Sequence, residues 1–145
     1  CNLAYQVPRK KEADYIGKQA LEAMRDKIEV GEKPYSNQLV GFTLGGKPIE
    51  EYAPDFWLIS EDGSTPIGYL TSPWYSPELG TNIAMGYVPY DKKAIGTSFK
   101  IHLPDEYCDT PGTPVDGVIV DMPFRPSVNA NARELAKDKG RDTAF

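Results

Sequence analysis

The stretch Gln38-Leu39-Val40-Gly41-Phe42-Thr43-Leu44-Gly45-Gly46 decides the fold of this chain. Val40, Phe42 and Leu44 alternate with their neighbours, and a period of two is that of a half-buried β-strand. The glycine pair at the end of the run is a turn signal and terminates the strand. The chain keeps this period as far as residue 122, which predicts a domain made mainly of β-strands.

Further short apolar runs follow, separated by turns rich in glycine and proline. The dipeptide Asp62-Gly63 predicts a tight type I′ hairpin between two of them, because both central residues of that turn need a positive φ. About six short strands with such turns favour an antiparallel sandwich or barrel over a parallel sheet. Besides the first strand, we expect strands at residues 56–60, 65–71, 82–88, 99–103 and 115–122.

Helical patterns flank the predicted strands on both sides. Before them, Asp14 is placed to cap a helix, and Gly31 follows the last periodic residue as a stop signal. After them, residues 131–139 have the composition of a short surface helix. The first helix is amphipathic, and its apolar residues at helical spacing are Ile16, Ala20, Leu21, Met24 and Ile28.

Composition and charge argue against several classes of function. The chain has 145 residues and a formal net charge of −5, so it would repel a phosphate backbone and we expect no nucleic-acid partner. No apolar run approaches the ~20 residues of a membrane span, and we expect no membrane partner. Two cysteines, Cys1 and Cys108, are too few for a disulfide framework and favour free thiols and a cytoplasmic location. Residues 3–8 alternate like a strand already under way, so we expect a chain cut from a longer one.

The sequence offers no recognisable catalytic grouping. His102 is the single histidine and alternates with Ile101 and Leu103, so we expect it to face solvent. Cys108 has acidic neighbours, whereas a nucleophilic thiol needs nearby positive charge to lower its pKa. No cysteine and histidine cluster has the spacing of metal ligands. We therefore assign no catalytic and no metal-binding residue to this chain.

Two features indicate ligand binding instead. Trp74 and Tyr75 are adjacent aromatics in a proline-bracketed loop at residues 73–77, which is either a wall for a planar ligand or a patch packed onto the strands. Arg125 stands close to two prolines, and its guanidinium is either a bidentate clamp for a carboxylate or a plain surface group.

Taken in order, several segments resemble the glycine-cleavage T-protein (aminomethyltransferase) family. The resemblance starts in the helical segment and continues through most of the strands, with an order and spacing that fit that family's carboxy-terminal domain. The segments that carry it are Asp14-Tyr15-Ile16-Gly17-Lys18-Gln19-Ala20-Leu21, Gln38-Leu39-Val40-Gly41-Phe42, Ile67-Gly68-Tyr69-Leu70-Thr71-Ser72, Ser76-Pro77-Glu78-Leu79-Gly80, Ile83-Ala84-Met85-Gly86-Tyr87-Val88, Gly96-Thr97 and Pro123-Phe124.

Together with the strand pattern, the resemblance implies an antiparallel six-stranded barrel with Greek-key-like connections, one amino-terminal amphipathic helix and a short carboxy-terminal helix. Residues 1–37 would connect to a preceding domain, 38–125 would form the barrel and 126–145 the tail. The implied cofactor is tetrahydrofolate, held mainly by upstream domains of the same polypeptide, which would also carry the catalytic carboxylate. The barrel would line one side of the folate and substrate cavity, with Arg125, Trp74 and Tyr75 as its contacts. The substrate would be a small-molecule methyl or aminomethyl donor.

Three departures from the glycine-cleavage pattern resemble the branch of folate-dependent demethylases that act on methoxyaromatics or dimethylsulfoniopropionate. Pro73-Trp74 stands where the family has a glycine, residues 104–114 resemble an inserted loop, and the tail runs on after Arg125. Two other functions stay open: a stand-alone ligand- or peptide-binding barrel module, and the carboxy-terminal domain of a flavoenzyme similar to sarcosine or dimethylglycine dehydrogenase.

Overall fold

The computed structural model describes residues 12–124, which fall into two units. One unit is Asn37–Phe124, and the helix α1 (Lys18–Glu29) belongs to the other. In chain order the first of these contains β1 (Asn37–Leu44), β2 (Trp57–Ser60), β3 (Pro66–Leu70), β4 (Trp74–Ser76), β5 (Thr81–Pro89), the 3₁₀ turn η2 (Tyr90–Lys92), β6 (Ser98–Ile101), the 3₁₀ turn η3 (Asp105–Tyr107) and β7 (Val115–Val120).

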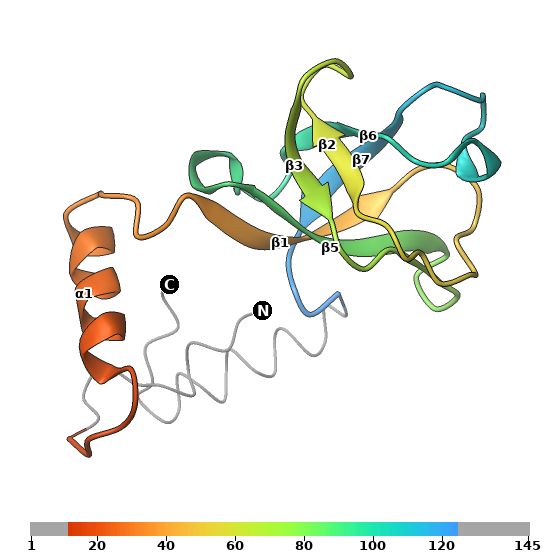
Figure 1. Cartoon of the computed structure of the whole chain (residues 1–145). Helices are drawn as coiled ribbons and strands as arrows, with labels where there is room; N and C mark the ends of the chain where they lie inside the picture. Colours follow the sequence, from red (N-terminus) through yellow and green to blue (C-terminus); the bar gives the residue numbers. More distant parts are fainter. Residues whose placement is uncertain (1–11, 125–145) are drawn as a thin grey trace. The chain divides into compact units, whose positions relative to one another are not determined.

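Within the described residues, six strands close into an antiparallel barrel (Figure 1). Neighbours follow the order β1-β7-β6-β2-β3-β5, and the pairing of β5 with β1 along eight residue pairs completes the ring. After β1 the chain crosses through residues 45–56 to β2, continues to β3 and returns to β5 beside β1, which is a Greek-key connection. Closure pairs both edges of each of these strands.

The barrel interior is filled by the inward side chains of alternating strands. Val40, Phe42 and Leu44 of β1 are all buried, as their period of two predicts. Phe42 meets Phe99 of β6 edge to face, with ring centroids 6.2 Å apart. Further fully buried core residues are Ile49, Ile59, Leu70, Val88, Ile101 and Ile119.

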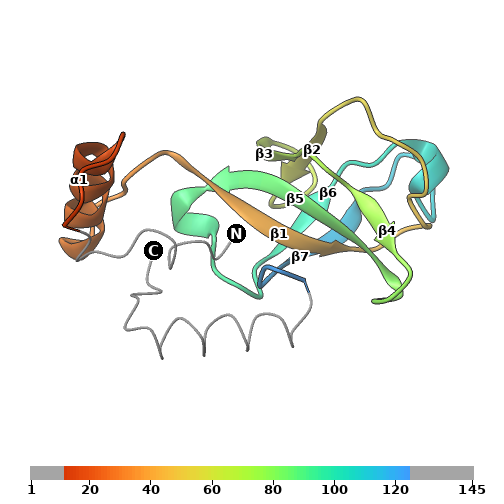
Figure 2. The same cartoon turned by 90° about the horizontal axis from the view of Figure 1, so that it is seen from below.

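The structure confirms the predicted mainly β fold and adds one strand to it. Trp74 and Tyr75, predicted to lie in a loop, belong to the short strand β4, which pairs with β5 outside the six-stranded ring (Figure 2). The flanking prolines keep this backbone extended, and an extended segment beside a long strand pairs with it. The prediction of a loop at residues 73–77 was therefore wrong for its central residues.

The hairpin between β2 and β3 is present, but its turn is wider than predicted. Ser60 pairs with Pro66, so residues 61–65 form the connection in place of a two-residue type I′ turn, and a register shift precedes it. Side chains hold this wider loop together. Asp62 Oδ1 accepts hydrogen bonds from the amide and hydroxyl of Ser64, and Ser60 Oγ accepts one from the amide of Gly63.

The predicted amino-terminal helix is confirmed, with a later start. Gly17, with a φ of 87°, occupies the cap position and makes no side-chain cap, whereas Asp14 accepts a bond from the amide of Tyr15. Ile16 precedes the helix and is fully exposed, so the predicted cap and the start of the apolar face were wrong. The predicted stop is confirmed, because Gly31 has a positive φ just beyond the last turn. The helix predicted at residues 131–139 lies outside the described residues.

Candidate functional site

The outer face of β5 is apolar although it does not belong to the barrel core. Alternation along β5 turns Asn82 and Ala84 inwards and turns Ile83, Met85 and Tyr87 outwards. Their cross-strand partners on β1 lie on the same side, because directly opposite residues in an antiparallel pair share a face. We call this surface the outer β5 face and define it by Leu39, Gly41, Thr43, Ile83, Met85 and Tyr87.

Trp74 extends the outer β5 face at one end. It lies opposite Ile83 in the β4–β5 pair and is 47% exposed. Tyr75 lies opposite the inward-facing Asn82 and is half-buried. Successive side chains of a strand point to opposite sides, so the two aromatics diverge and Trp74 alone joins the outer β5 face. The sequence analysis treated the two aromatics together, either as a ligand wall or as a packed patch, because a loop does not impose this alternation.

A buried amide anchors the strand that carries Trp74. Asn82 is 2% exposed, and its Oδ1 accepts a hydrogen bond from the amide of Ile49 at 3.0 Å. Its Nδ2 donates to the carbonyls of Gly45 at 3.3 Å and Lys47 at 3.0 Å. The carbonyl of Ile49 in turn accepts a bond from the amide of Tyr75 at 2.7 Å. Sequence reasoning missed Asn82, whose only signal was a polar residue at an inward position of an alternating strand.

The end of the barrel folds back over the outer β5 face at Gly41. A Cβ at this position would lie 2.6 Å from Cγ of Met122 and 2.9 Å from Cε1 of Phe124. Those distances are shorter than van der Waals contact, so only glycine lets the two side chains rest here. Arg125, the predicted carboxylate contact, lies outside the described residues. Its described neighbour Phe124 is thus on the same face as Trp74.

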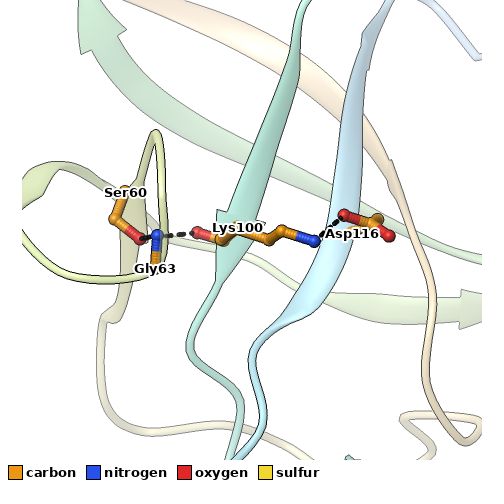
Figure 3. A network of polar contacts seen from close by, with 4 residues as sticks. All are labelled: Ser60, Gly63, Lys100 and Asp116. Carbon is orange, nitrogen blue, oxygen red and sulfur yellow. Dashed lines mark hydrogen bonds and ion pairs between the residues drawn. The ribbon is translucent and has the colours of Figure 1, made fainter.

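His102 is a structural partner of Ser60, not a lone solvent-facing group. It is half-buried, and its Nε2 lies 2.8 Å from Oγ of Ser60. The Ser60 hydroxyl also accepts a hydrogen bond from the amide of Gly63, and its oxygen lies 3.4 Å from the carbonyl oxygen of Lys100 (Figure 3). Because Ser60 is fully buried, a substrate cannot reach this hydroxyl. The pair ties the β2–β3 hairpin to β6, and the prediction that His102 faces solvent was wrong.

Cys108 is a free, buried thiol that belongs to the core. Burial raises its pKa, and the nearby Asp105 carboxylate adds to the effect, whereas Lys47 opposes it. A thiol with a raised pKa is a poor nucleophile at neutral pH. Its Sγ donates towards the carbonyls of Leu103 and Pro104, at 3.5 Å each. The residue therefore holds the loop that follows β6 in place.

Two kinds of site are absent from the part of the chain that the structure describes. Residues 12–124 bring together no three histidine, cysteine or acidic side chains able to hold a metal ion. They also include no helix with the length and hydrophobicity of a membrane span.

These features define a small closed β-barrel domain with an apolar outer surface beside β5. Residues 37–124 match the family described as the glycine cleavage T-protein C-terminal barrel domain, and the chain belongs to that family. The sequence-based resemblance is thereby confirmed.

Curated relatives carry the name aminomethyltransferase. The protein of Halothermothrix orenii is 35% identical over 77% of this chain, which covers 27% of that relative. The mitochondrial protein of Solanum tuberosum is 34% identical over 82% of this chain and 25% of its own length. The crystal structure of the glycine cleavage system aminomethyltransferase T of Bartonella henselae matches 85% of this chain and 30% of its own, with a TM-score of 0.59 and 25% identity. The chain thus spans between a quarter and a third of these proteins.

Proposed function

We propose that this chain is the carboxy-terminal barrel of a tetrahydrofolate-dependent aminomethyl- or methyltransferase, and that it lines one side of the folate and substrate cavity. The names of the relatives support the activity, and the short share of their length supports a role that needs further polypeptide. In this proposal the acid, base or nucleophile for transfer belongs to the upstream polypeptide. The barrel therefore acts by positioning and by excluding water.

The observation that carries this proposal is the half-exposed Trp74 on the outer β5 face. Tetrahydrofolate presents flat rings at one end and glutamate carboxylates at the other. An indole face suits a flat ring by stacking, and an arginine suits a carboxylate by paired hydrogen bonds. Trp74 would contact the rings, and Arg125, one residue beyond Phe124, would hold the carboxylate. Tyr75, the third predicted contact, lies on the other side of β4 from Trp74. Bound folate would accept the one-carbon unit.

The partners follow from the same reasoning and are part of the proposal. They are the upstream domains of the same polypeptide, which would hold most of the folate, and a small-molecule donor of the methyl or aminomethyl group. We expect neither a nucleic-acid nor a membrane partner. We also expect the protein in the cytoplasm, which cell fractionation would check.

Isothermal titration with tetrahydrofolate tests the proposal. The product of the complete reading frame around these residues should bind stoichiometrically, and residues 1–145 alone should not bind measurably. Trp74→Ala in the complete protein should weaken binding about tenfold, the loss of one stacked ring. Leu79→Ala is the matched control, because Leu79 is another exposed apolar residue, 38% exposed. Tight binding by residues 1–145 alone would contradict the proposal, as would a reading frame that starts at Cys1.

The chemical identity of the one-carbon donor distinguishes an aminomethyltransferase from a folate-dependent demethylase. The Pro73-Trp74 pair that departs from the glycine-cleavage pattern is the segment that puts an indole on the outer β5 face. This observation favours a demethylase with an aromatic or sulfonium methyl donor as the second candidate. Incubation of the complete protein with tetrahydrofolate and either a methoxyaromatic acid or dimethylsulfoniopropionate should give 5-methyltetrahydrofolate in that case. Product formed only with an aminomethyl donor would assign it to the first branch.

A further inference from the structure

We infer that an apolar row of side chains across four strands is the surface through which the barrel packs against the rest of a longer polypeptide. The inference rests on the proposed function and names the surface by which this domain joins its partner. We call the surface the aromatic row and define it by Phe56, Leu58, Tyr69, Tyr87 and Leu39. The row crosses the opposite end of β5 from Trp74.

Strand register places the row residues side by side. Leu58 of β2 lies opposite Tyr69 of β3, and Tyr69 lies opposite Tyr87 of β5. Tyr87 in turn lies opposite Leu39 of β1. The chain of opposite pairs therefore runs across four neighbouring strands on the outside of the barrel.

The rings of the row also contact one another. The Phe56 ring stacks on that of Tyr69, with centroids 5.3 Å apart, and the Tyr69 ring meets that of Tyr87 at 5.5 Å. The strands beneath them are close, because a Cβ at Gly68 would lie 2.2 Å from the carbonyl oxygen of Tyr87. Such a fixed set of rings loses little side-chain entropy when a partner covers it.

Two members of the row are more exposed than their apolar character favours. Phe56 is 66% exposed and Leu58 is 46% exposed. Both lie next to Tyr69, Phe56 by ring stacking and Leu58 by strand pairing. Contiguous exposed apolar side chains mark surfaces that another protein covers. The outer surface of β6 and β7 is polar by contrast. There the outward side chains of Lys100 and Asp116 form an ion pair at 2.6 Å, which is typical of a solvent-exposed surface.

The start of the barrel in the chain and the length of the relatives together point to one occupant. The chain enters the barrel at Asn37, two residues before Leu39, so polypeptide arriving from upstream reaches the barrel beside the row. The relatives are more than three times as long as the part of them that this chain covers. We therefore commit to the preceding domains of the same polypeptide as the occupant, and not to a second copy of the chain.

Hydroxyl-radical footprinting of the complete protein and of residues 1–145 tests this inference. Modification of Phe56 and Leu58 should fall about fivefold in the complete protein, since residues at the centre of an interface become fully buried. Tyr52 and Ile95 are matched controls, with 79% and 64% exposure and no place in the row, and their rates should stay equal in the two proteins.

Each other outcome decides the inference. Equal rates at Phe56 in both proteins would overturn it, even if the complete protein bound tetrahydrofolate. Protection of Phe56 without folate binding would uphold it and would contradict the proposed function alone. Protection within residues 1–145 that grows with concentration would assign the row to self-association and overturn the inference.

Discussion

At the scale of single residues, the barrel places polar groups inside only where they have partners. Burial of an amide without hydrogen bonds is costly, and Asn82 avoids this cost through its three bonds to residues 45–49. Ser60 does the same through Gly63 and His102. Both residues fix connections between strands, so their role is to hold the surfaces that β4 and the hairpin present.

We predict that Asn82→Ala lowers the free energy of unfolding by about 2–4 kcal/mol, because it leaves one amide and two carbonyls unpaired in a closed space. Urea denaturation of residues 1–145 measures this. Asn37→Ala is the control, since Asn37 is exposed at the start of β1 and its loss should cost less than about 0.5 kcal/mol. A cost for Asn82→Ala as small as that of the control would show that loop 45–49 does not depend on this amide.

The buried thiol of Cys108 predicts a dependence of stability on alkaline pH. Because burial raises the pKa of Cys108 in the folded state, its contribution is present below the unfolded pKa of about 8.5 and is lost as the pH rises through the folded pKa. The difference in unfolding free energy between the wild type and Cys108→Ala should therefore shrink from pH 7 to pH 10. A difference that stays constant over this range would mean that the folded thiol ionises normally.

At the scale of elements, close contact between β1 and the residues that follow β7 shapes the outer β5 face. Met122 and Phe124 fold onto β1 because position 41 has no side chain. This contact places Phe124, the last described residue, on the outer β5 face. A change at one glycine of β1 should therefore displace the end of the barrel.

We predict that Gly41→Ala destabilises the protein by about 1–3 kcal/mol through overpacking against Met122. Gly45→Ala is the matched control, because its Cβ would meet nothing closer than 3.6 Å. The double variant Gly41→Ala with Met122→Ala should cost less than the sum of the two single changes, since the smaller side chain removes the clash with Met122 and leaves only the one with Phe124. Thermal unfolding measures all four proteins, and strictly additive costs would contradict the contact.

The element scale also shows what the sequence could predict. The period of two in Val40, Phe42 and Leu44 predicted β1 correctly, because these large apolar side chains all point to the core side of the strand. The short strand β4 was missed, because three residues are too few to show a period. The hairpin was predicted with too short a turn, because Asp62-Gly63 is a purely local signal. The wider turn depends on hydrogen bonds of Ser60 with Gly63 and His102, which require the register shift in β2 and the neighbouring strand β6.

The candidate site was predicted less completely than the fold. Trp74 is exposed as one of the two predicted alternatives requires, but Tyr75 turns to the other side of β4. The aromatic row was not predicted at all. Its members are far apart in the sequence, and only the barrel register brings Leu58, Tyr69 and Tyr87 together.

At the scale of the whole molecule, residues 37–124 match a family described as a C-terminal barrel, and the chain covers 27% of one relative's length. In our proposal the barrel completes a larger protein. The outer side of β5 carries both the proposed ligand contact, at Trp74, and the proposed docking surface, at Tyr87. If the end of β5 at Tyr87 lies in the docking interface, the other end of β5, next to Trp74, would lie at the edge of that interface. That arrangement would make the barrel one wall of a shared cavity.

This arrangement predicts coupling between docking and ligand binding. Phe56→Ser with Leu58→Ser in the complete protein should weaken tetrahydrofolate binding about tenfold, although neither residue touches the ligand. Ile95→Ser, a change at an equally exposed residue outside the row, should leave the affinity unchanged. Titration of the three proteins measures this, and unchanged affinity in the row variant would separate the two surfaces.

The most direct test of the account is a crystal structure of the complete protein with tetrahydrofolate bound. The indole of Trp74 should lie within about 4.5 Å of the ligand, and the upstream domains should cover Phe56 and Tyr69. A ligand bound elsewhere, with the outer β5 face open to solvent, would contradict it.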